Sequence, residues 1–214
     1  MGTETSKTRD LILNCVERLM LEAGYAGVTY RAIAAKAGVT PGLVQYYFPT
    51  QDEVFVAAIR RRSQQNLEKL AEALRARPDQ PLHVLWDYSR DESAAALTTE
   101  FLALGNHRKS IRAEITEWTE RVRRLQIDAL DEAIRERPVT LGPLSQGTLL
   151  FLVTGIPKLI RLEEGVGIAS AHAEVVKEFQ EFLDSVEPAG GGRAAGTPPP
   201  HHRGGWAGEF ARPQ

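Results

Sequence analysis

The stretch from Thr40 to Tyr47 contains several side chains that can donate hydrogen bonds to the edges of nucleic-acid bases or accept them from these edges. Within eight residues it offers the hydroxyl of Thr40, the amide of Gln45 and the phenols of Tyr46 and Tyr47, and it contains no carboxylate. An amide that donates and accepts at once matches the edge that adenine presents in the major groove of DNA. Because acidic groups are missing from the stretch, it would not repel phosphates. The chemistry that fits these residues is therefore recognition of a nucleic acid.

Local capping signals predict two short helices that position these side chains. Thr29 can cap a helix over residues 30–36, because its hydroxyl can accept a hydrogen bond from a backbone N–H of the first turn. Thr40 can cap a second helix over residues 41–47, whose first position is a proline that needs no N–H there. Residues 37–39, Ala-Gly-Val, form the expected tight turn between the two helices.

The small residues around this turn indicate a helix-turn-helix. Ala34, Ala37 and Gly38 leave room for two helices that cross closely, and Val39 and Val44 can fill the space beneath them. In a helix-turn-helix the second helix enters the major groove. An inert packing motif is the alternative, but it does not account for the agreement of caps, turn and helix end. The residues left on the outer side of the second helix are Thr40, Pro41, Gly42, Leu43, Gln45, Tyr46 and Tyr47.

Further signals bound the neighbouring helices. Phe48-Pro49 ends the second short helix, because the residue before a proline avoids helical angles. Residues 50–53, Thr-Gln-Asp-Glu, form a capping box that starts a long helix from Gln51 towards Arg77. A first helix over residues 7–23 precedes the motif and ends at a glycine, which enters the left-handed conformation cheaply.

The sequence from Gly27 to Val54 resembles the DNA-binding signature of the TetR/AcrR family of transcription regulators. Gly24-Tyr25 and Arg9 also fit, so the resemblance covers about residues 7–60. The rest agrees in length and helical character, as expected for a family with divergent bodies. The resemblance implies an all-α fold, in which a three-helix helix-turn-helix head is joined to a helical-bundle body that binds a ligand and dimerises.

The resemblance also implies roles for single residues. Thr29 and Arg31 resemble residues that touch phosphate and a base, and Tyr46 and Tyr47 resemble contacts to bases and the sugar-phosphate backbone. Gln45 stands where the family more commonly has a tyrosine. The full set of expected DNA contacts is Thr29, Arg31, Thr40, Pro41, Gly42, Leu43, Gln45, Tyr46, Tyr47 and Gln51.

Position 51 departs from the family pattern. The family usually has a lysine there, whose charge and helix N-terminus grip phosphate, and this chain has Gln51. The backbone N–H groups at the helix start can still hold a phosphate. We therefore expect Gln51 to remain in the interface, with a lower affinity or a weaker salt dependence than is typical.

Helical periodicity continues through the remaining chain. A segment rich in Gly, Pro, Ala and Arg follows, and such a composition predicts a disordered tail. The expected domains are a DNA-binding head (1–60), a ligand-binding and dimerisation body (61–187) and the tail (188–214). The expected body helices cover residues 82–90, 92–106, 110–137, 144–164 and 170–186.

Composition excludes several other classes of protein. The chain has 214 residues, 43% of them hydrophobic and 25% charged, and its net charge of −2 argues against a general nucleic-acid binder. No apolar run is long enough for a membrane span. Cys15 is the only cysteine, so no internal disulfide can form and we expect a cytoplasmic protein. The five histidines show no metal-ligand spacing, so we expect no metal site. We also expect no cofactor and no catalytic residues.

A ligand pocket is expected in the body. Aromatic side chains there can line a cavity or fill the core, and a proline inside a helix frees a backbone carbonyl that can become a polar spot in an apolar pocket. A kink that only shapes packing is the alternative. The expected lining is Trp86, Phe101, Trp118, Phe151, Thr154 and Pro157.

The last two helices predict a homodimer. Residues 149–153 are five apolar residues in a row, so their helix is apolar on more than one face and needs a second surface to cover it. The final helix offers more apolar residues, and together they would form a four-helix interface with their symmetry mates. The expected interface residues are Phe151, Val175, Phe179, Phe182 and Leu183.

These features favour a ligand-responsive DNA-binding repressor that reads a near-palindromic operator on double-stranded DNA and is released by a small apolar or amphipathic ligand. A second hypothesis keeps DNA binding but makes the chain an activator or a ligand-independent factor. A third, a helical binding or enzyme module with a non-functional head, lacks a catalytic constellation to support it.

Overall fold

The computed structural model describes residues 2–90, 92–136 and 144–188. Over these ranges the chain is all-α with no strand, which confirms the expected fold class. None of the helices in these ranges is long and apolar enough to cross a membrane. The elements are α1 (Gly2–Ala23), η1 (Tyr25–Gly27), α2 (Tyr30–Ala37), α3 (Pro41–Tyr47), α4 (Gln51–Ala76), α5 (Pro81–Arg90), α6 (Glu92–Gly105), α7 (Lys109–Glu136), α8 (Gln146–Glu164) and α9 (His172–Val186).

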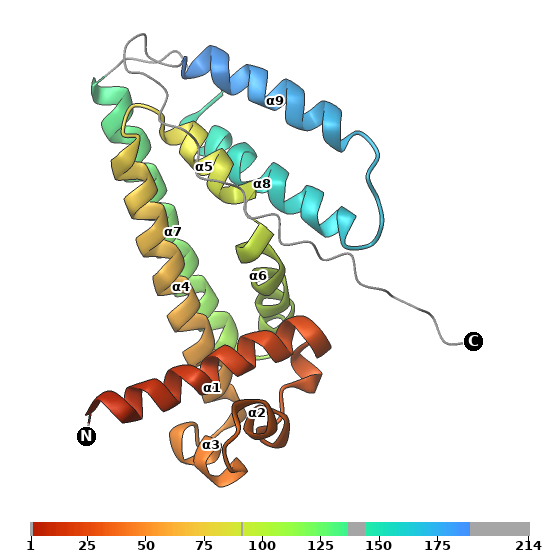
Figure 1. Cartoon of the computed structure of the whole chain (residues 1–214). Helices are drawn as coiled ribbons and strands as arrows, with labels where there is room; N and C mark the ends of the chain where they lie inside the picture. The colour runs from red at the N-terminus through yellow and green to blue at the C-terminus, as the bar shows by residue number, and fades with distance from the viewer. Residues whose placement is uncertain (1, 91, 137–143, 189–214) are drawn as a thin grey trace.

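The helices form a head at one end and a long body above it (Figure 1). In the head, α1 crosses the base of α4, and α2 and α3 lie beneath α1. The long helices α4 and α7 run side by side away from the head. They lead to α5, α8 and α9, which lie together at the far end, while α6 connects the two levels.

Two hydrophobic cores hold these parts together. The lower core joins α1, α2, α3 and the start of α4 to α6 and the first half of α7, with Phe55 and Trp118 among its members. The upper core joins α4, α5, α7, α8 and α9 around Trp86. Because the lower core spans both sides of residue 60, the head is packed onto the body, and the domain boundary expected there stays a prediction.

Charged contacts fix the lower end of α7 against α4. Asp52, in the first turn of α4, accepts hydrogen bonds from Arg108 and from Ser110. These hydrogen bonds hold the pKa of Asp52 below its ordinary value, with that from Ser110 contributing most. Two further turns along, Arg60 pairs with the buried Glu114 at 2.8 Å. Through these contacts α7 holds the start of α4, and hence the head.

The upper end of the body is tied by Glu187, which follows α9. Its carboxylate accepts the backbone N–H groups of Leu82 and His83, at 3.0 and 2.8 Å, and so caps the start of α5. The same carboxylate lies 2.7 Å from Nδ1 of His83, and Asp184 lies 2.8 Å from Nε2. The hydrogen bond to Glu187 raises the pKa of His83, burial opposes it, and Asp184 raises it further.

The expected helix boundaries differ from the structure at a few ends. The first helix begins at Gly2 rather than at residue 7. The last begins at His172 rather than at 170, because Ala171 adopts a left-handed φ of 66° and cannot continue a helical turn. The break expected over residues 138–143 and the tail from 189 onward lie outside the described residues.

Candidate nucleic-acid interface

Threonine caps start both short helices of the head, as the sequence predicts. The hydroxyl of Thr29 accepts the backbone N–H of Ala32 at 3.1 Å, and that of Thr40 accepts the N–H of Leu43 at 3.3 Å. Each hydroxyl keeps its own hydrogen, which is free to be donated outward. Between the helices Gly38 adopts a left-handed φ of 67°, the conformation that glycine enters cheaply.

Contacts behind the two helices fix their orientation. The phenol of Tyr30 donates to the carbonyl of Phe48 at 2.9 Å, which joins the start of α2 to the end of α3. Lys36 pairs with Glu22 at 2.7 Å and ties α2 to α1. The guanidinium of Arg9 lies 5.2 Å from the centre of the Phe48 ring. Sequence reasoning gave Tyr30 and Lys36 no role, because their partners lie 18 and 14 residues away along the chain.

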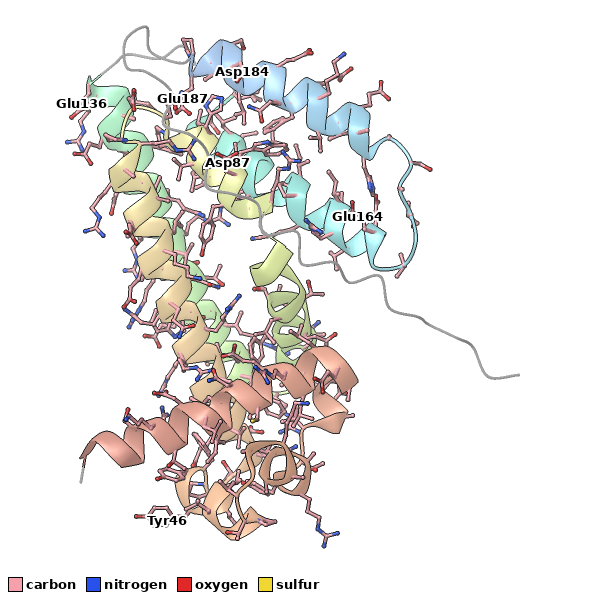
Figure 2. All side chains as sticks on the ribbon, viewed as in Figure 1. Tyr46, Asp87, Glu136, Glu164, Asp184 and Glu187 are labelled. Atoms are coloured by element: carbon pink, nitrogen blue, oxygen red, sulfur yellow. The ribbon has the colours of Figure 1, made fainter. Side chains whose placement is uncertain are left out.

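The outer side of α3 is uncovered. Pro41, Gly42 and Gln45 are exposed, and Tyr46 is 77% exposed and points away from the head (Figure 2). Its ring meets Tyr47 edge-on at 5.5 Å, while Tyr47 itself packs against the lower core. Val44 is the fully buried anchor of the helix. The helix therefore presents most of the side that the sequence predicts, while Leu43 and Tyr47 are partly buried.

The charge of this surface suits a polyanion. Residues 23–51 contain no acidic residue, and their charged side chains are Arg31 and Lys36. Arg31 is exposed in the first turn of α2. The exposed amide of Gln45 on α3 can form the paired hydrogen bonds that adenine offers. The surface thus combines one cation with neutral donors and acceptors, which fits phosphate contacts around a base-reading helix.

Gln51 has a contact that the sequence did not predict. Its side-chain amide donates to the backbone carbonyl of Val28 at 2.5 Å and holds the entry to α2. Thr50 caps the start of α4 by accepting the N–H of Glu53, and the other backbone N–H groups of that turn can still hold an anion. The contact gives Gln51 a positioning role, and its expected place in the DNA interface stays a prediction.

The residues expected to line a ligand pocket are divided between the two cores. Phe101 and Trp118 belong to the lower core, and Trp86 is fully buried in the upper one against Phe179, at 4.9 Å between ring centres. Phe151, by contrast, is 66% exposed. The described structure does not bring these side chains together around one cavity, so the pocket stays a prediction.

The hydroxyl of Thr154, expected to contribute to a polar spot in the pocket beside Pro157, forms a hydrogen bond within its own helix. Thr154 is buried and its hydroxyl donates to the carbonyl of Leu150 at 2.8 Å, one turn earlier in α8. Pro157 is also buried, inside the same helix. The hydroxyl of Thr154 is therefore used within the helix, although its oxygen can still accept a hydrogen bond.

The residues expected at a dimer interface differ in how far they are exposed. Leu183 is fully buried, while Phe179 and Phe182 are partly buried and pack against the upper core of their own protomer, so the interface expected at these residues stays a prediction. A periodic apolar stripe shows that a helix face is buried, but not against what. Within the body, the exposed large apolar side chains lie chiefly on α8 and on the segment after it: Phe151, Leu159, Leu162, Val166 and Ile168, with Val175 on α9 and Leu102 on α6.

The head of the chain is similar to known transcription regulators. Residues 12–58 match the family model described as bacterial regulatory proteins of the tetR family. The chain is 34% identical over 82 residues to the HTH-type transcriptional repressor BepR of Brucella suis biovar 1 (strain 1330), and 39% identical over 54 residues to the HTH-type transcriptional regulator PksA of Bacillus subtilis (strain 168). These matches cover 38% and 25% of this chain, and 39% and 26% of the two relatives.

The fold as a whole has solved counterparts. A protein of Saccharomonospora viridis described as a transcriptional regulator, solved in complex with choline, superposes with a TM-score of 0.65 at 15% identity. The superposition covers 84% of this chain and 96% of that one. At this identity the likeness concerns the fold, and it extends through the body, beyond the matched head.

Proposed function

We propose that the chain is a DNA-binding transcription regulator, a proposal supported by the match of residues 12–58 to the model of the tetR family of bacterial regulatory proteins. The observation that carries the proposal is the outer side of α3, where Gln45 and Tyr46 are exposed on a helix that is anchored from behind by Val44. Such a helix can enter the major groove with the amide at base-edge distance. Arg31 and the hydroxyls of Thr29 and Thr40 are the proposed phosphate contacts.

The regulator is proposed to act as a homodimer. On α8, Phe151, Leu159 and Leu162 are 66%, 58% and 51% exposed, and their helical spacing places them on one side of the helix, called here the α8 surface. Large apolar patches on a soluble chain mark interaction sites. Two-fold pairing of this surface would place two heads on one DNA molecule, and their spacing would decide whether both can dock in successive major grooves.

Ligand control and repression are the finer parts of the proposal. BepR, the relative at 34% identity, is named a repressor, and the structural counterpart from Saccharomonospora viridis holds a small molecule. A ligand bound in the body would release DNA by favouring a head spacing that does not fit the operator. It can do so only through a difference in its affinity for the two spacings.

The proposal is tested by gel shift with the DNA upstream of the chain's own gene, at a fixed salt concentration and with unrelated DNA as competitor. We expect a specific complex that survives excess competitor, and its loss in Gln45→Ala combined with Tyr46→Ala. Binding that is equal for specific and unrelated DNA would refute sequence recognition. A reporter that rises after deletion of the gene would support repression, and one that falls would support activation.

A further inference from the structure

A histidine lies between two carboxylates where the end of α9 meets the start of α5. Nδ1 of His83 lies 2.7 Å from a carboxylate oxygen of Glu187, and Nε2 lies 2.8 Å from one of Asp184. Figure 2 labels both carboxylates at this end of the body. His83 belongs to the first turn of α5, while Asp184 lies in the last turn of α9 and Glu187 directly follows it. One ring therefore joins two helices that are far apart along the chain.

The two contacts together require a protonated ring. A neutral imidazole donates through one nitrogen and accepts through the other, and an ionised carboxylate can only accept. Glu187 already accepts the backbone N–H groups of Leu82 and His83, so it too acts as an acceptor here. A neutral ring would bond to one carboxylate and turn a lone pair towards the other. The imidazolium, which donates through both nitrogens, satisfies both contacts.

The charges that face the ring come from the α9 side. On the segment that leads into and through α5 the acidic residues are Asp79 and Asp87, and Asp87 pairs with Arg77 at 2.8 Å. From α7 and α8, the described residues that adjoin Glu187 are uncharged, namely Leu130, Ala133, Ile134, Gln146 and Leu149. The hydrogen bond to Glu187 raises the pKa of His83, burial opposes it, and Asp184 raises it further. The charge environment thus agrees with the geometry.

Loss of the proton would weaken the hold on Glu187. This carboxylate is only 6% exposed, and without the charged ring it would keep two backbone N–H groups as its partners. A buried charge that loses its counter-ion is costly, and moving the carboxylate into water relieves that cost. Such a movement would uncap α5 and draw the end of α9 away from the upper core, where Leu183 and Val186 are buried.

We propose that His83 is a pH-dependent latch: the protonated ring fastens the end of α9 to the start of α5, and loss of its proton releases this end of α9. The inference goes beyond the proposed function, because the latch acts in the body with or without DNA. Its stabilising effect is complete below the ordinary histidine pKa of about 6.5 and is lost as the pH rises through the raised pKa of the folded chain. Alkaline conditions therefore loosen the upper end of the body.

NMR titration of the histidine ring signals in the full chain tests the proton. The signals of His83 are identified as those missing from His83→Gln. We expect His83 to titrate with a midpoint above about pH 6.5, and Asp184→Asn to lower that midpoint. The signals of His107, an exposed histidine before α7, are the control and should not respond to Asp184→Asn. A midpoint of His83 at or below the ordinary value would overturn the proposal.

Hydrogen exchange of the full chain tests the release of α9. The unaltered protein and His83→Gln are compared at the same pH, so that the direct effect of pH on exchange cancels. At about pH 6 the amides of residues 180–186 should exchange at least tenfold more slowly in the unaltered protein, and by about pH 9 the difference should disappear. His107→Gln should match the unaltered protein throughout. An equal difference at both pH values would show a histidine with a structural role only, and would refute the latch.

Thermal unfolding of Asp184→Asn guards against loss of the fold. Glu187→Gln would alter the cap of α5 together with the latch, whereas Asp184→Asn leaves the cap in place. The melting temperature of the unaltered protein should exceed that of Asp184→Asn at about pH 6, and the two should converge by about pH 9. No gap at the lower pH, or the same gap at both, would contradict the proposal. Neither measurement uses DNA, so a chain that fails them but binds its operator would contradict this inference alone.

Discussion

Two helices leave one side uncovered, α3 in the head and α8 in the body, and they do so with opposite chemistry. The outer side of α3 carries an amide and phenols, while that of α8 carries Phe151, Leu159 and Leu162. Polar groups left exposed are satisfied by water and can exchange it for base edges, whereas exposed apolar groups gain by leaving water altogether. The contrast supports the proposals that DNA binds to the first surface and a second copy of the chain to the other.

The largest effect is expected from the α8 surface. Leu159→Glu combined with Leu162→Glu should convert the dimer to a monomer, because two carboxylates per copy would be buried in the interface without partners. Operator affinity should then fall by about 10²–10⁴-fold, the gain that linked binding of two heads provides. Sedimentation velocity measures the change in oligomeric state, and gel shift measures the fall in affinity.

Leu102→Glu is the matched control for that experiment. Leu102 is a comparably exposed leucine on another helix, α6, so its replacement should leave both dimer and affinity unchanged. A dimer that survives the double substitution on α8 would remove this surface from the interface. The proposal that α8 binds a second copy of the chain would then be refuted, while the proposal for α3 would stand.

The next effect is expected from the reading amide. Gln45→Ala should weaken operator binding by about 1–3 kcal/mol and relax the preference at one base pair in each half-site. Titration against the operator and its single-base variants measures both changes. Gln65→Ala, an exposed glutamine on α4, should change neither. An unaltered preference at every base pair would show that Gln45 makes no base-specific contact.

Substitutions of two glycines in the head, Gly42 and Gly38, should distinguish effects on stability from effects on DNA binding. A Cβ added at Gly42 would meet no atom of the protein, so Gly42→Ala should stabilise the fold by up to about 1 kcal/mol. The added methyl would face DNA and weaken operator binding several-fold. Gly38→Ala should instead destabilise the fold by about 1–2 kcal/mol, because its left-handed φ strains any other residue.

Denaturant unfolding and gel shift measure the two glycine variants side by side. If Gly42→Ala bound the operator as tightly as the unaltered protein, the N-terminal turn of α3 would not approach DNA closely. A rise in stability for Gly38→Ala would contradict the left-handed turn between α2 and α3.

The smallest effect concerns Arg31. Arg31→Ala should lower the magnitude of the salt slope of operator binding by about 0.9 for each phosphate that the guanidinium neutralises, with a modest decrease of affinity at low salt. Lys177→Ala, on α9 and far from the head, is the control and should leave the slope unchanged. A slope unchanged in Arg31→Ala as well would place that guanidinium outside the interface.

The head was largely predictable from the sequence, because its signals are local. Thr29 and Thr40 bond to groups three residues ahead, and Gly38 takes its special angle within a single turn. The contact of Gln51 with Val28 was not predicted, for the opposite reason. The Gln51 amide bonds to Val28, which lies 23 residues away, and no local pattern reports such a contact.

The sequence predicted the helices of the body, but not which of their side chains are buried and which are exposed. Trp86 and Phe151 are both aromatic residues on amphipathic helices, yet one is fully buried and the other largely exposed. Periodicity indicates that Phe179 lies on a buried face, and the structure adds that its own Trp86 covers it. The contact of Arg123 with Phe151 needs the packing of α7 on α8, and no local sequence pattern reports a contact between residues so far apart along the chain.

The most direct test of the account is hydroxyl-radical footprinting of the unaltered protein on the DNA upstream of its gene. We predict two protected half-sites with related, inverted sequences on one face of the duplex, with centres one helical turn, about 34–36 Å, or a multiple of it apart. Both should disappear together in the α8 double variant, and the protection should shift in sequence preference with Gln45→Ala. A single protected site, or protection that ignores sequence, would contradict a dimer that reads DNA with α3.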